Sequence, residues 1–79
     1  RLAYEAMEKG GNMPCILNAA NEVVNLAFRE GKCGFLQMSE VIEQTMGTTS
    51  FITEPTYEDY VQTDKEARKI AKELLKLFN

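Results

Sequence analysis

The chain has 79 residues, of which 44% are hydrophobic and 27% are charged, and nine Lys and Arg against twelve Asp and Glu give a net charge of −3. This length suits one globular domain and is too short for two independent cores. The acidic balance disfavours a binder of nucleic acid or of anionic membranes, because both need clustered cationic side chains, and no apolar run approaches the roughly 18 residues that cross a bilayer.

The first helix is expected at residues 1–9. Apolar side chains recur there at helical spacing, and Gly10-Gly11 follows where a left-handed helix end is common. The apolar positions are Leu2, Ala3, Ala6 and Met7. A helical pattern already under way at Leu2, with no initiating Met and no cap before it, indicates a piece excised from a longer protein.

A second helix is expected over 14–30. Pro14 suits its first turn, because the N–H group that proline lacks has no helical partner there, and Asn12 or Met13 is expected at the cap. Gly31 supplies a stop. The apolar stripe of this central helix is Ile16, Leu17, Ala20, Val23, Val24, Ala27 and Phe28.

The same helix carries an unusual polar face opposite its apolar stripe. Its members are Asn18, Asn21, Glu22 and Asn25. Three Asn residues inside one helix oppose helix propensity, so something outside the helix must compensate. The favoured interpretation is hydrogen bonding to a neighbouring helix, a loop or water that fixes the packing register. A direct ligand-binding or catalytic role and contact with a partner domain are the alternatives.

A third helix is expected over 35–46, ended by the run at 47–50. Its apolar positions are Phe35, Met38, Val41, Ile42, Thr45 and Met46. The five residues that follow are too short, and too interrupted by proline, for a strand. They are predicted to form an ordered loop that inserts Phe51 or Ile52 into the core.

A long final helix is expected from Thr56 to about Phe78. Thr56 and Asp59 resemble a capping box, in which each residue bonds the backbone N–H of the other. A second such pattern at Thr63 leaves a kink or break there as an alternative. The inner stripe of this helix is predicted to be Tyr57, Tyr60, Val61, Ala67, Ala71, Leu74, Leu75 and Phe78.

Continuing that stripe places Asp64 and Arg68, four residues apart, on the face that should point inward. Burying one charge alone is costly, so we expect an ion pair partly covered by the second helix. Hydrogen bonds from Asn18, Asn21 or Glu22 would satisfy both groups. These five residues form the predicted structural polar network, and no catalytic role follows from it.

Cys15 and Cys33 are the only cysteines. A helix between them would separate their Cα atoms by more than about 20 Å, whereas a disulfide needs less than about 7 Å. Free thiols are therefore predicted, which fits a reducing, cytoplasmic compartment. The chain has no His to activate them, no glycine-rich dinucleotide loop and no cluster of metal-ligating residues. No catalytic, cofactor-binding or metal-binding residue is predicted.

Several strings resemble one known family. They are Leu17-Asn18-Ala19-Ala20-Asn21-Glu22-Val23-Val24, then Ala27-Phe28, Gly31-Lys32 and Phe35, and finally Asp64 with Ala67-Arg68 and Ala71. Together with the Glu-Lys-Gly-Gly-Asn-Met-Pro stretch before them, they look like the C-terminal helical domain of 1-deoxy-D-xylulose 5-phosphate reductoisomerase. The resemblance covers nearly the whole chain.

The resemblance implies a parent enzyme that rearranges 1-deoxy-D-xylulose 5-phosphate and reduces the product with NADPH to 2-C-methyl-D-erythritol 4-phosphate, in non-mevalonate isoprenoid biosynthesis. It implies that NADPH and a Mg or Mn ion are bound by other domains of a homodimeric parent. The present domain would support the catalytic domain of the same chain and would be inactive alone. A free-standing helical module that binds another protein is the alternative.

The four expected helices together predict an all-α fold. It is a four-helix bundle-like domain with a short first helix and a long last helix, and residues 1–79 are expected to form one helical domain.

Overall fold

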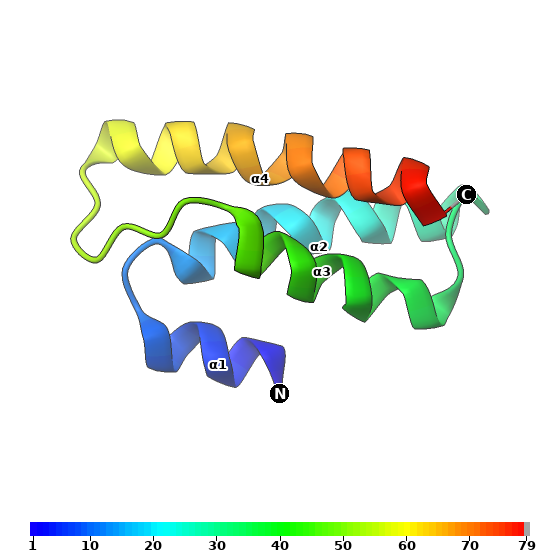
Figure 1. Ribbon diagram of the computed structural model, residues 1–79, viewed down its shortest axis with the longest axis horizontal. Coiled ribbons are helices and arrows are strands. Elements are labelled where there is room, and N and C mark those ends of the chain that lie inside the picture. The colour runs from blue at the N-terminus through cyan, green and yellow to red at the C-terminus, as the bar shows by residue number, and fades with distance from the viewer. Residues whose placement is uncertain (79) are drawn as a thin grey trace.

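The computed structural model describes residues 1–78, which contain four α-helices and no strand. The helices are α1 (Leu2–Lys9), α2 (Met13–Arg29), α3 (Phe35–Thr48) and α4 (Tyr57–Phe78). Consecutive helices run in opposite directions, so that α2 and α4 run the same way with α3 packed against both (Figure 1). Helix α1 packs mainly on α2. The all-α prediction, with a short first and a long last helix, is confirmed.

Helix α2 forms the centre of the core, because its broad apolar stripe is covered by the other three helices. Ile16 and Val24 are fully buried, and each contributes about 1.5–3 kcal/mol relative to an exposed side chain. Small residues dominate where α2 meets α4, which allows the two helices to approach closely. The buried apolar cluster is Ala6, Met13, Ile16, Ala19, Ala20, Val23, Val24, Ala27, Cys33, Val41, Ile42, Met46, Ala67, Ala71 and Leu75.

The beginning of α4 differs from the sequence prediction. Tyr57, Tyr60 and Val61 are 81%, 42% and 44% exposed, so their predicted place in the inner stripe is wrong. The helix instead buries residues spaced four apart, which are Thr63, Ala67, Ala71 and Leu75. This stripe of mostly small side chains lets α4 lie close to α2, whereas the tyrosines would hold the helices apart.

The capping box is confirmed, since the N–H groups of Thr56 and Asp59 donate to each other's side-chain oxygens. Helix α4 continues through Thr63 without a break.

Other apolar residues at predicted core positions also face outward. Met7 on α1 is 74% exposed, and Ala3 is exposed as well. Phe28 and Phe35 lie at the turn between α2 and α3, where their rings pack edge to face with centroids 6.2 Å apart. Each ring covers part of the other, yet both remain exposed to solvent. Helical periodicity therefore predicted the helices correctly, but the predicted apolar stripes are wider than the helix faces that other helices cover.

The loop between α3 and α4 is held by a buried amide. The side chain of Asn12 is fully buried, and its Nδ2 donates to the carbonyl oxygen of Ser50 and to Oγ1 of Thr63, both at 2.9 Å. Its Oδ1 accepts from the N–H of Ile52 at 2.8 Å, and the backbone N–H of Asn12 donates to the carbonyl oxygen of Ile52 at 3.0 Å. One residue therefore joins the start of α2, the loop and α4.

This arrangement corrects the prediction for the loop. Phe51 is 38% exposed, with Lys9 Nζ 4.9 Å from its ring centroid, and Ile52 is half-buried outside the core cluster. Hydrogen bonds of the loop backbone, rather than a buried apolar side chain, hold the loop in place. Gly11 permits the close approach, because it has a φ of 55° and a Cβ there would meet the carbonyl oxygen of Ile52. Asn12 occupies the predicted cap position, but its side chain makes no capping bond.

Replacing Asn12 with Ala is expected to destabilise the chain by about 3 kcal/mol, because one buried and two part-buried hydrogen bonds are lost at once. Urea unfolding followed by circular dichroism measures the change. Asn18→Ala is the matched control, since Asn18 is exposed on the same helix and Ala is the better helix former, so its effect should stay within about 0.5 kcal/mol. Equal losses in the two variants would contradict the role of the buried amide.

Candidate functional site

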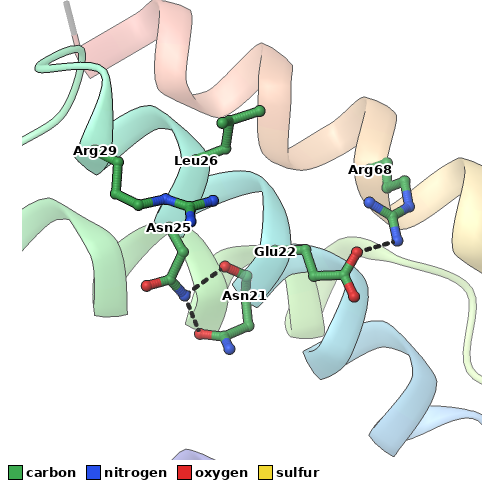
Figure 2. A pocket seen from close by; sticks show the side chains of 6 residues that line it. All are labelled: Asn21, Glu22, Asn25, Leu26, Arg29 and Arg68. Carbon is green, nitrogen blue, oxygen red and sulfur yellow. Dashed lines mark hydrogen bonds and ion pairs between the residues drawn. The ribbon is translucent and has the colours of Figure 1, made fainter.

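A group of polar side chains on the surface joins α2 and α4. Arg68 Nε donates to Asp64 Oδ2 at 2.9 Å, one turn earlier on α4, and Arg68 Nη2 donates to Glu22 Oε1 on α2 at 2.7 Å (Figure 2 shows the second contact). Asn18 Nδ2 lies 3.4 Å from Glu22 Oε2. These four residues are called the α2–α4 polar cluster below.

The local sequence explains how this cluster forms. Asp64 and Arg68 are four residues apart on one helix, with the acid nearer the N-terminus, which is the favourable order for such a pair. Asn18 and Glu22 have the same spacing on α2, so they share the face that α4 approaches. The guanidinium is long and carries several donors, and it bonds a carboxylate on each helix.

Asn21 lies outside the α2–α4 polar cluster. The side chain of Asn25 donates to its backbone carbonyl at 2.7 Å and to its Oδ1 at 3.0 Å, as Figure 2 shows. Asn21 precedes Glu22 by one position and is therefore rotated by about 100° around the helix, away from Asp64. Of the five residues predicted to form a polar network, the structure brings four together and places the fifth in a separate pair on α2.

The cluster is only partly shielded from water. The side chains of Arg68, Asp64 and Glu22 are 34%, 40% and 56% exposed. Hydrogen bonds to Asp64 and then to Glu22 raise the pKa of Arg68 above its already high ordinary value, so the guanidinium stays charged. Exposed pairs of this kind contribute modestly to stability, since water and salt screen them.

Cys15 lies beside the cluster, with its Sγ 3.7 Å from the carbonyl oxygen of Tyr60. Burial raises the pKa of the Cys15 thiol, the negative charge of Asp64 raises it further, and Arg68 acts in the opposite direction. A thiol with a raised pKa is a poorer nucleophile near neutral pH, because the thiolate is the reactive form. Cys15 and Cys33 are both free, so the predicted absence of a disulfide is confirmed.

A surface groove of about 490 Å³ adjoins the cluster. It is lined by Asn21, Glu22, Asn25, Leu26, Arg29 and Arg68 (Figure 2). Its guanidinium and amide groups are suited to hydrogen bonding with a polar surface, but the groove contains no nucleophile paired with a base. Within residues 1–78, no three side chains of His, Cys, Asp or Glu are grouped closely enough to hold a metal ion. The described residues therefore do not fit the divalent cation that the family resemblance implies.

The buried polar contact that joins Asn12 to Thr63 was not predicted from the sequence. The two residues are 51 positions apart, and Asn12 occupies a position where a helix cap explains an Asn equally well. The only available signal was the Gly-Gly-Asn run before Pro14, which leaves the direction of the amide open.

In the described residues, none of the helices combines the length and the apolar character that a bilayer-crossing segment requires.

A double-mutant cycle on Glu22→Gln and Arg68→Gln is expected to give a coupling energy below about 1 kcal/mol, which shrinks as salt is added. Partial exposure is the reason, and urea unfolding of the four proteins provides the measurement. The more exposed Arg1–Glu5 pair serves as the control and should couple less. A coupling that is large and insensitive to salt would contradict this account.

The Asp64→Asn substitution should accelerate alkylation of Cys15 at mildly alkaline pH, because removing the carboxylate lowers the thiol pKa and increases the thiolate fraction. Peptide mapping by mass spectrometry after iodoacetamide treatment separates Cys15 from Cys33. Glu73→Gln removes an exposed carboxylate farther along α4 and should leave the rate unchanged. A slower reaction in the Asp64 variant would show that the sign is wrong.

Comparisons with known proteins match this chain to one domain of longer proteins. The profile of the family described as "DXP reductoisomerase C-terminal domain" matches residues 1–70. Among similar proteins, the 1-deoxy-D-xylulose 5-phosphate reductoisomerase of Bacteroides fragilis is 65% identical over 74 residues, which cover 94% of this chain and 19% of the relative.

The corresponding enzyme of Phocaeicola vulgatus is 66% identical over 74 residues, again 94% of this chain and 19% of the relative. That of Chlorobium chlorochromatii is 44% identical over 75 residues, which are 95% of this chain and 20% of the relative. The chain thus spans about a fifth of the length of the relatives it matches. Because the family profile covers most of the chain, the chain belongs to the DXP reductoisomerase C-terminal domain family.

Proposed function

We propose that this chain is the supporting C-terminal domain of a 1-deoxy-D-xylulose 5-phosphate reductoisomerase. The observation that carries the proposal is the match of the family profile to residues 1–70. The high identity to enzymes of that name over nearly the whole chain supports it. In this proposal the parent enzyme rearranges 1-deoxy-D-xylulose 5-phosphate and reduces the product with NADPH to 2-C-methyl-D-erythritol 4-phosphate, a step of isoprenoid biosynthesis.

In this proposal the groups that the reaction needs lie in other parts of the parent chain. Hydride transfer requires a bound nicotinamide, and a divalent cation in such a site polarises a substrate oxygen. Polar side chains of the domain instead join its elements, as in the contact of Arg68 with Glu22 and that of Asn12 with Thr63. We therefore assign the binding of NADPH and of the Mg or Mn ion to the rest of the parent chain. We expect this domain to be inactive when it is isolated.

The domain contributes by packing against the catalytic domain of the same chain. A bundle in which one helix is covered by three others, and one loop is held by a buried amide, offers a stiff support for neighbouring catalytic loops. The parent is further proposed to be a homodimer. Two free thiols support a reducing, cytoplasmic compartment.

The test compares NADPH consumption by the full-length parent, by the parent truncated before Arg1, and by residues 1–79 alone. With 1-deoxy-D-xylulose 5-phosphate and Mg²⁺ present, the full-length protein should consume NADPH. The truncated protein should lose both activity and thermal stability, because its catalytic domain loses its support. Residues 1–79 alone should consume none. Full activity and full stability of the truncated protein would contradict a supporting role, and turnover by the isolated domain would contradict its assignment as non-catalytic.

A further inference from the structure

Helix α1 is the least supported helix of the domain. It has eight residues, packs mainly on α2, and buries only Ala6, with Leu2 partly buried beside it. Isolated helices shorter than about 12–15 residues are marginal in water, so a helix of this length depends on tertiary contacts. In Figure 1, α1 lies at the edge of the bundle, with α2 and α3 between it and α4. The domain itself supplies few such contacts.

The apolar stripe of α1 is wider than the part that α2 covers. Ala3, Tyr4 and Met7 continue this stripe around the helix, and all three are exposed, Tyr4 at 69% and Met7 at 74%. These three residues are called the outer face of α1. Tyrosine and methionine are enriched in protein interfaces, where a large apolar body makes contact while a polar tip or a flexible chain adapts.

We propose that the outer face of α1 docks against the part of the full-length reductoisomerase that precedes this domain. The inference rests on the proposed function. This chain spans 19% of a similar reductoisomerase, and the family it matches is described as the C-terminal domain. In a full-length member, the remaining chain therefore joins this domain next to α1.

Covalent attachment favours the preceding part of the chain as the partner that docks on the outer face of α1. A surface close to the point of attachment meets the tethered partner at a high effective concentration, and closing a short connection costs little chain entropy. Phe28, Phe35 and Tyr57, which are also exposed, lack that advantage. Phe28 and Phe35 lie at the turn between α2 and α3 and already pack on each other. Tyr57 begins α4, on the side of the bundle opposite α1 (Figure 1).

Hydroxyl-radical footprinting of the full-length enzyme, read by mass spectrometry, tests the proposal. Tyr57 is the matched control for Tyr4, because the two side chains have the same chemistry and are 81% and 69% exposed in the domain. Tyr4 and Met7 should be labelled several-fold more slowly than Tyr57. Labelling of Tyr4 and Met7 as fast as Tyr57 would overturn the proposal, as would protection of Phe35 in place of Tyr4.

Two further measurements identify the occupant. Protection that disappears on dilution, together with dissociation seen by light scattering, would point to a second copy of the chain and overturn the proposal. In the full-length protein, the Tyr4→Ser, Met7→Ser double variant should lower the Tm, whereas Tyr57→Ser should leave it unchanged. An unchanged Tm in the double variant would count against docking at α1.

NADPH consumption by the same preparation separates this proposal from the proposed function. An active enzyme in which Tyr4 and Met7 are freely labelled leaves the function standing and removes the docking face. A folded full-length protein that protects both residues but consumes no NADPH with substrate and Mg²⁺ supports the docking face and removes the proposed function.

Discussion

The buried side-chain amide of Asn12 is the contact on which the arrangement of the other elements depends. It satisfies Ser50 and Ile52 in the loop and Thr63 in α4, while its own backbone begins α2. The bond to Thr63 is buried and the two to the loop are part-buried, so each group would be costly without its partner, and the amide favours one register between the two helices. Once Thr63 is held at the start of α2, the small residues that follow it on α4 face the core. Arg68 is then brought beside Glu22.

Local signals in the sequence predicted the four helices well, because helical periodicity, Pro14, the glycines and the Thr56–Asp59 capping box all act within a few residues. The inner face of the first two turns of α4 escaped prediction for the opposite reason. Tyr57, Tyr60 and Val61 are the larger apolar residues, yet the face that α2 covers begins with a polar Thr63. Nothing within several turns of Thr63 shows that an amide 51 positions earlier satisfies its hydroxyl. Hydrophobicity alone therefore selected the wrong side of the first two turns.

The α2–α4 polar cluster could also be predicted only in part from the sequence. The spacing of Asp64 and Arg68 predicted their contact, and a partner on α2 was predicted among three candidates. Choosing between Asn21 and Glu22 requires the rotation of α2 relative to α4 to within one residue, or about 100°. That angle follows from core packing and from the Asn12 contact rather than from any local pattern. Of the two i,i+4 pairs on α2, Asn18–Glu22 reaches α4 through Arg68, whereas Asn21 and Asn25 bond each other and line the groove beside Glu22.

Stability within the domain is uneven, and this bears on how such a domain would support an enzyme. Helices α2, α3 and α4 share one core, whereas α1 adds mainly Ala6 to it. Local opening should therefore be easiest at α1, since few buried contacts oppose it. If the preceding part of a full-length chain covers the outer face of α1, docking and the folding of α1 become coupled, because each supplies contacts that the other lacks. The least stable helix of the domain would then be the element that connects the rigid bundle to the catalytic part. Helix α1 would be more stable in the full-length protein than in the domain alone.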